Sequence, residues 1–181
     1  MAAKELFTYV YEFTGPYEEK ARKLTSIIDS ASGAALFHSG IELFMTSAIV
    51  GALSNTRKPR IRGNTSYKIF SDQFKTHYDD CMFIFKLVML TSKDPSAQPI
   101  DLINNAFKYS PESPEYSENA RIFEEYMLGG LTVIYDKLMV SSNKRYDDYL
   151  VSLNDLINKY TSDSSDSKAD GSDIDFDTPI F

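Results

Sequence analysis

The sequence predicts an all-α protein, with a single compact bundle of five or six helices over residues 1–160 and a disordered acidic tail over residues 161–181. Apolar residues recur at helical spacing through several segments, and capping and proline signals mark the ends of those segments. The tail is dominated by Ser, Asp and Gly, so it cannot bury enough apolar surface to fold by itself. The rest of the chain can build a sizeable core, because 43% of the sequence is hydrophobic and 13% is aromatic.

The first half of the chain predicts two helices. Residues 4–13 alternate aromatic and polar side chains, which fits a short strand or an extended arm equally well. A helix is expected over residues 16–32, because proline suits the first helical position and Glu18 and Glu19 complement the helix dipole. Its apolar stripe consists of Ala21, Leu24, Ile27 and Ile28. The next helix, residues 34–53, is apolar nearly all round and so belongs in the middle of the bundle.

The second half predicts four further segments of helix after a loop at residues 55–70. A helix is expected over residues 71–91, a short one over 99–109, a long one over 114–139 and an amphipathic one over 144–160. The inward side chains of the short helix are expected to be Leu102, Ile103, Ala106 and Phe107. The stripe of the last helix is expected to be Tyr146, Leu150, Leu153, Ile157 and Tyr160.

Two consecutive glycines, Gly129 and Gly130, interrupt the long helical pattern. Each glycine costs about 1 kcal/mol relative to alanine in a helix interior. We therefore expect a second helix to approach closely at this point, rather than a catalytic role.

A basic segment follows the second helix. From residue 55 to residue 70 the chain carries five basic residues and no acidic one, in a stretch that we expect to be flexible around Gly63 and Asn64. Such a loop can neutralise phosphates, and Pro59 argues against a base-reading helix, so any contact would be mostly to the DNA backbone. The alternatives are a solvated loop or one that packs against the protein's own acidic tail. The candidate DNA-binding residues are Arg57, Lys58, Arg60, Arg62 and Lys68.

The acidic tail ends in apolar residues that have no packing reason to be there. The run from Thr161 holds six aspartates and one lysine, a net charge of −5 out of −7 for the whole chain. This ending resembles the C-terminal tip of bacterial single-stranded DNA-binding proteins, where an acidic run precedes Ile-Pro-Phe. That resemblance implies that the tail docks a DNA-processing protein. The alternative is a tail that only keeps the protein in solution. The candidate partner-binding residues are Asp175, Phe176, Asp177, Pro179, Ile180 and Phe181.

Catalytic and metal-binding signatures are missing. Cys81 is the only cysteine, so no internal disulfide is expected and a reducing cytoplasm fits. His77 and Cys81 share a helical face, but two ligands are too few for a metal. The adjacent acids Glu124 and Glu125 diverge on a helix and do not form an acid–base pair. With no phosphate-binding loop, dinucleotide fingerprint or nucleophile triad, we expect no enzymatic activity, no cofactor and no membrane span.

Three segments resemble small helical proteins encoded beside bacterial DNA phosphorothioation (Dnd) genes. They are residues 41–51 followed by the Arg57-Lys58-Pro59 step, the Ile69-Phe70 pair, and residues 124–131 with their Glu-Tyr-x-x-Gly-Gly-Leu pattern. The resemblance spans roughly residues 34–139. It implies an accessory role in a bacterial DNA-modification or anti-phage defence system, with no catalytic residues to transfer.

The sequence therefore predicts a non-enzymatic accessory or adaptor protein of bacterial DNA defence or repair. Its helical domain would contact DNA or a partner subunit through the basic loop, and its tip would dock a protein. One alternative is a single-stranded DNA-binding protein, although the strand pattern of that family is missing. Another is a purely structural helical subunit of a larger complex without DNA contact. An oligomer is compatible with either.

Overall fold

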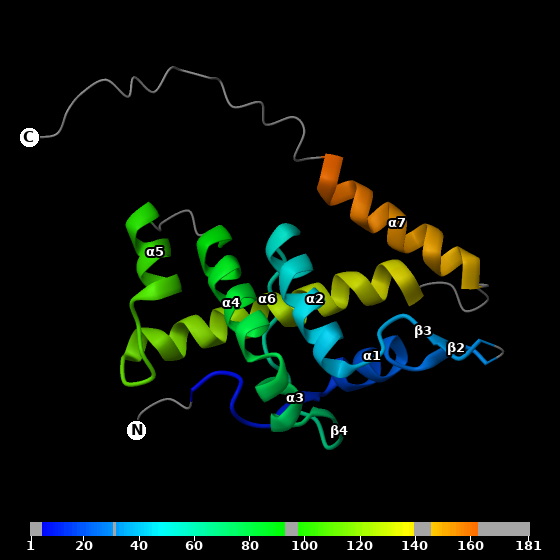
Figure 1. The fold of residues 1–181 in the computed structure, drawn as a ribbon, viewed down its shortest axis with the longest axis horizontal. Coiled ribbons are helices and arrows are strands. Elements are labelled where there is room, and N and C mark those ends of the chain that lie inside the picture. The colour runs from blue at the N-terminus through cyan, green and yellow to red at the C-terminus, as the bar shows by residue number, and fades with distance from the viewer. Residues whose placement is uncertain (1–4, 31, 93–97, 140–145, 163–181) are drawn as a thin grey trace, which may run out of the picture.

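The computed structural model describes residues 5–30, 32–92, 98–139 and 146–162, and it confirms a mostly helical fold (Figure 1). The longest helix, α6, runs through the middle of the molecule, with α4 and α5 towards one end and α1 towards the other. The described elements are, in chain order, β1 (Tyr11–Thr14), α1 (Pro16–Leu24), β2 (Ile27–Asp29), β3 (Ala34–Ala35), α2 (Gly40–Leu53), β4 (Ser66–Ile69), α3 (Ser71–Thr76), α4 (Tyr78–Thr91), α5 (Pro99–Phe107), α6 (Pro114–Met139) and α7 (Tyr146–Ser162).

Helix α1 is shorter than predicted because hydroxyl side chains end it. The Thr25 Oγ1 donates to the carbonyl oxygen of Ala21 (2.9 Å), and the Ser26 Oγ donates to that of Lys23 (2.7 Å). Such side chains compete with the helical pattern and favour its termination. Ile27 consequently lies in β2 and is 65% exposed, so the prediction that it belongs to the α1 stripe is wrong.

Helix α2 starts six residues later than predicted, at Gly40. Ser39 caps it by accepting a hydrogen bond from the Glu42 backbone N–H (3.3 Å), and the Glu42 carboxylate accepts one from the backbone N–H of His38 (3.0 Å). This reciprocal pair fixes the helix start at Ser39. Residues 34–35 instead form β3, which pairs antiparallel with β2.

The segment predicted as a loop at residues 55–70 contains a strand. Strand β4 pairs antiparallel with β1, with Tyr11 opposite Ile69 and Phe13 opposite Tyr67. The aromatic alternation of the N-terminal segment is therefore a strand at its end. Its partner lies more than fifty residues along the chain, where single-sequence patterns give little warning of pairing.

Three further details of the helices differ from expectation. The helix predicted over residues 71–91 is divided at His77, whose φ of −112° and ψ of 25° are not helical. In α5, Ile103 and Phe107 are 49% and 61% exposed rather than inward, and Ala106 is the buried residue. In α7, Ile157 is 52% exposed and Leu156 is buried in its place. In both α5 and α7, apolar residues expected to face inward are therefore exposed.

The double glycine of α6 allows the close helix contact that the sequence predicted. A Cβ atom on Gly130 would lie 1.8 Å from the carbonyl oxygen of Ser47 in α2, and one on Gly51 would lie 1.9 Å from that of Tyr126 in α6. On the neighbouring position, a Cβ on Gly129 would lie 1.9 Å from the carbonyl oxygen of Thr56. Three glycines thus bring α2 and the residues after it onto the backbone of α6.

Candidate functional site

The basic loop is held along α6 by its own backbone. The Lys58 N–H donates to the carbonyl oxygen of Glu125 (2.9 Å), and the carbonyl oxygens of Pro59 and Ile61 accept from Tyr17 (2.8 Å) and Thr14 (2.6 Å). A Cβ on Gly63 would lie 2.4 Å from the backbone nitrogen of Gly15. These contacts hold the loop to α1, β1 and α6 at Lys58, Pro59 and Ile61, and the flexibility expected around Gly63 and Asn64 stays a prediction.

Three of the five candidate DNA-binding side chains are paired with acids. Arg57 contacts Glu125 (2.6 Å), Arg60 contacts Glu124 (2.5 Å), and Lys68 contacts Glu12 (3.1 Å). The bond from Lys68 holds the pKa of the Glu12 carboxyl below its ordinary value. Folding therefore neutralises most of the positive charge that the loop carries in the sequence.

Lys58 and Arg62 are the two remaining basic residues of the loop. Both side chains are exposed, and neither forms an ion pair with any residue that the structure describes. They lie two residues before and two residues after Arg60. Since the loop backbone is fixed, these two cations are presented to solvent from a rigid base.

The acids of α6 form a network with the loop. Glu124 and Glu125 bind different arginines, as expected for neighbours that diverge on a helix. Arg121 bridges Glu125 and Glu118, and its bonds to Glu118 lower the pKa of that carboxyl. The sequence carried no sign of this partnership, because the arginines and their acids are 64 and 68 residues apart.

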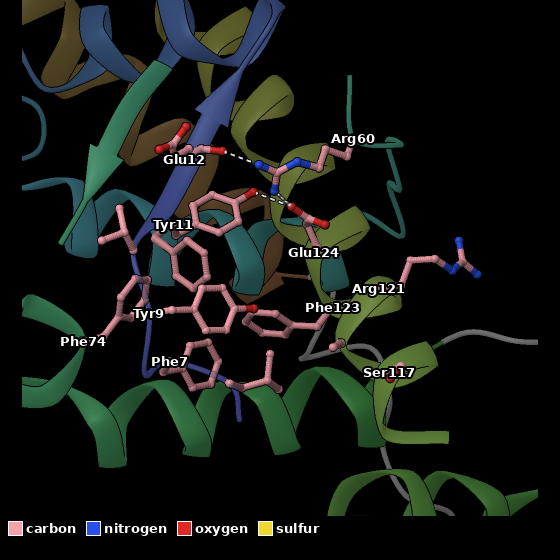
Figure 2. Close-up of a pocket in the computed structure, with 14 residues that line it drawn as sticks. Phe7, Tyr9, Tyr11, Glu12, Arg60, Phe74, Ser117, Arg121, Phe123 and Glu124 are labelled. Atoms are coloured by element: carbon pink, nitrogen blue, oxygen red, sulfur yellow. Dashed lines mark hydrogen bonds and ion pairs between the residues drawn. The ribbon is translucent and has the colours of Figure 1, made fainter. Parts of the chain in front are cut away.

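An aromatic cavity of about 450 Å³ opens beside the loop (Figure 2). It lies between the N-terminal segment, the loop and the first turns of α6. Arg60 belongs both to the loop and to the wall of this cavity. The sequence gives no sign of this site, because its residues come together only in the fold. The lining residues are Leu6, Phe7, Tyr9, Val10, Tyr11, Glu12, Phe44, Arg60, Phe74, Ser117, Ala120, Arg121, Phe123 and Glu124.

The polar side of the cavity is centred on Glu124. Its Oε1 accepts hydrogen bonds from the Tyr11 hydroxyl (2.9 Å) and from Arg60 (2.5 Å), and Arg60 also donates to the carbonyl oxygen of Glu12 (3.0 Å). The Arg60 guanidinium lies 5.4 Å from the centre of the Tyr11 ring. Burial, reinforced by the charge of Glu124, raises the pKa of Tyr11 well above its ordinary value. Tyr11 is therefore a neutral hydrogen-bond donor at physiological pH.

The part of the cavity wall that the N-terminal segment forms holds a strained residue. Phe7 is buried and has a φ of 61°, a left-handed conformation that a phenylalanine rarely adopts. Its ring stacks on Phe74 with 5.8 Å between centres and meets the edge of Phe123 at 5.7 Å. These ring contacts hold the strained backbone, and strain of this kind clusters at functional sites.

A second surface exposes large apolar side chains on α4 and α5, and we call it the outer apolar stripe. Its most exposed members are Phe83 (67%) and Phe107 (61%), and Lys86 lies over the Phe107 ring at 5.4 Å, which joins the two helices. Exposed apolar patches of this kind mark interaction surfaces. The outer apolar stripe consists of Phe83, Leu87, Leu90, Ile100, Ile103 and Phe107.

Cys81 and the remaining candidate features lie outside the loop and the cavity. Cys81 is buried. Among the described residues, no group of three or more His, Cys, Asp or Glu side chains is placed to hold a metal ion. None of the helices in the described ranges combines the length and apolarity needed to cross a bilayer. The candidate tip residues, 175–177 and 179–181, lie outside the described part of the chain.

Comparison with protein families decides the affiliation of this chain. The family model described as DNA sulphur modification system-associated protein 4 matches residues 17–173. The chain belongs to this family. The match confirms the resemblance to Dnd-associated proteins and extends it from α1 to α7 and beyond. No curated protein and no solved structure matches the chain.

Proposed function

We propose that this chain is a non-enzymatic, cytoplasmic accessory protein of a bacterial DNA sulphur modification system that contacts the DNA backbone through its basic loop. Family membership supports the association with the modification system. The observation that carries the DNA contact is the pair of exposed cations, Lys58 and Arg62, on a loop whose backbone is fixed to α6. Cations held on a rigid base lose less conformational freedom when they bind than cations on a flexible arm.

The roles within the loop differ in this proposal. Lys58 and Arg62 meet phosphates, while Arg57 and Arg60 hold the loop on α6 through Glu125 and Glu124. Two phosphate contacts predict weak binding whose logarithm falls with the logarithm of salt concentration at a slope of about −2. This slope is much smaller than five free cations would give.

The test compares two charge-reversal variants of equal net charge. K58E/R62E changes the loop, and K75E/K137E reverses two exposed lysines of α3 and α6 that lie outside the loop sequence. Fluorescence anisotropy with a short labelled DNA duplex would be measured for each protein over a salt series. We expect K58E/R62E to weaken binding at least tenfold and to flatten the salt slope, because each lost phosphate contact removes about one unit of slope. K75E/K137E should stay within about twofold of the parent.

Equal losses in the two variants would show that only net charge matters, and would refute a contact at the loop. Binding that neither variant changes would place the DNA contact elsewhere. Circular dichroism of both variants controls for folding. Neither Lys58 nor Arg62 holds the loop through its side chain, so the helical signal should not change.

A second candidate function is a helical subunit that contacts only protein. The outer apolar stripe favours it, since Phe83 and Phe107 are exposed on adjoining helices. The same DNA experiment separates the two functions, because a subunit docked through α4 and α5 predicts no DNA binding that depends on Lys58 and Arg62.

The acidic tip adds a protein contact to the leading proposal. Its aspartates would steer a basic partner, and its apolar residues Ile180 and Phe181 would enter a pocket on that partner. Removal of Ile180 and Phe181 is the perturbation that tests this contact.

A further inference from the structure

The aromatic cavity has no role in the phosphate contact just described, although it shares Arg60 with the loop. Figure 2 shows the Tyr9 and Tyr11 side chains directed from the N-terminal segment towards α6, with Phe123 beside them and the Arg60–Glu124 pair at one side. Tyr9 is 37% exposed, whereas Phe7, Phe44, Phe74 and Phe123, which line the same cavity, are buried. A ring at the surface of an aromatic pocket is a platform on which a planar group can stack.

The hydrogen-bonding capacity of the cavity is only partly used. Oε1 of Glu124 accepts from both Tyr11 and Arg60, while its Oε2 finds no hydrogen-bond partner among the described residues. Arg60 uses one terminal nitrogen for Glu124 and the other for Glu12. The cavity wall therefore combines the partly exposed side chains of Glu124 (23%) and Arg60 (43%) with aromatic rings.

These features select among possible ligands. A purely apolar side chain entering the cavity would take Glu124 Oε2 away from water without giving it a donor, which is unfavourable. A nucleobase offers a planar face for stacking, and its edge carries both donors and acceptors, so it can bond the carboxylate and the guanidinium together. A volume of about 450 Å³ also falls within the range of small-molecule sites and is ample for one base.

The cavity shares Arg60 with the loop that carries the two exposed cations. Lys58 and Arg62 are each two residues from Arg60, which is at most about 7 Å along the chain. A base held against Tyr9 would therefore leave its flanking phosphates within reach of the loop.

We propose that the aromatic cavity binds one unpaired nucleobase of DNA, stacked on Tyr9 and hydrogen-bonded by Glu124 and Arg60, while Lys58 and Arg62 contact the flanking phosphates. This inference rests on the proposed DNA contact at the loop and adds what that contact recognises. The selectivity is for a base outside the double helix, because a paired base cannot enter the cavity.

The test uses three duplex probes that differ at one position: a fully paired duplex, the same duplex with one extra unpaired nucleotide, and the same bulge with an abasic residue. The two bulged probes have equal phosphate charge and differ only in the base. All four bases are tried at the bulge. Affinities are measured by fluorescence anisotropy with the parent protein, with Tyr9→Leu, which removes the ring and the hydroxyl, and with K58E/R62E. Melting temperatures report whether each variant folds.

We expect at least one bulged base to bind roughly tenfold more tightly than the abasic bulge and the paired duplex, as a stacked base contributes in other proteins. Tyr9→Leu should abolish that difference and leave paired-duplex affinity unchanged, whereas K58E/R62E should weaken all three probes. If the base-containing and abasic bulges bind equally to the parent protein, the cavity does not hold a base. That result leaves the loop contact standing when K58E/R62E still weakens the paired duplex. The proposed function fails instead if K58E/R62E binds every probe as the parent does.

Discussion

The close contact between α2 and α6 gives the sharpest prediction about this fold, and Gly130→Ala is the substitution that probes it. By helix propensity alone this change should stabilise α6 by about 1 kcal/mol. The structure predicts the opposite sign. The added Cβ would lie 1.8 Å from the carbonyl oxygen of Ser47 and 2.5 Å from the backbone nitrogen of Gly51. Both atoms belong to the backbone of α2, so no change of rotamer relieves the clash.

The size of the effect follows from the movement that the clash requires. To bring the Ser47 contact to 3.0 Å, α2 and α6 must separate by at least about 1.2 Å. A gap of 0.5–1 Å already forfeits a quarter to a half of each dispersion contact across an interface. We therefore expect a net loss of about 3 kcal/mol in the free energy of unfolding, at the upper end of ordinary overpacking. In a chain of this length that loss lowers the melting temperature by about 6–12 °C.

The assay is urea denaturation followed by circular dichroism, with Ser47→Ala as the matched control at the same interface. The Ser47 side chain is buried, and its hydroxyl has no hydrogen-bond partner in the described structure. Alanine is no larger than serine, so the helices can stay equally close. Because the lost hydroxyl has no hydrogen-bond partner in the described structure, Ser47→Ala should be as stable as the parent or slightly more stable. If Gly130→Ala were as stable as the parent, or more stable, the close-contact argument would be refuted and helix propensity would dominate.

Two further predictions concern the buried thiol of Cys81 and the C-terminal tip. Burial raises the pKa of the Cys81 thiol to about 12, so the native protein should not react with a thiol reagent at pH 8 to 9, and urea should restore the reaction; a fast native reaction would show that Cys81 is accessible. Because the folded pKa exceeds the unfolded value of about 8.5, the stability contributed by this thiol is full below that pH and falls as the pH rises towards 12. For the tip, affinity purification from nuclease-treated bacterial lysate should recover DNA-processing proteins with the full chain and lose them when Ile180 and Phe181 are removed; identical recoveries would make the tip a passive end.

Much of the fold could be predicted because its signals are local. Pro114 after Ser113 marks the start of α6. The helical spacing of apolar residues then continues to Met139, the last residue of α6 in the structure. The glycine pair also predicted a contact between distant parts of the chain. Two glycines destabilise a helix, so we expected a close contact with a second helix to offset that loss. The helix boundaries that were predicted wrongly are those that a few side-chain hydrogen bonds determine. Thr25 and Ser26 end α1, and Ser39 with Glu42 starts α2, inside stretches whose apolar composition favours a longer helix.

The candidate site was less predictable because its electrostatics are long-range. The loop is free of acids in the sequence, yet Glu124 and Glu125 reach it from α6 and Glu12 reaches Lys68 from the neighbouring strand. A cluster of basic residues therefore overstates the positive charge that the folded surface presents. The cavity is harder still to foresee, since its lining comes from the N-terminal segment, α2, the loop, α3 and α6.

The ion pairs that reduce the loop's charge also position what remains of it. Arg57 and Arg60 anchor the loop on α6, so Lys58 and Arg62 are held at fixed places on either side of Arg60. The pairing of Arg60 with Glu124 in turn completes the polar side of the cavity, because the same carboxylate accepts from Tyr11. Arg57 and Arg60 therefore have a structural role: they hold the loop that carries Lys58 and Arg62, and Arg60 also forms part of the cavity wall. Removal of the Arg60 side chain should accordingly affect both the loop and the cavity, whereas changes at Lys58 or Tyr9 should affect one of them each.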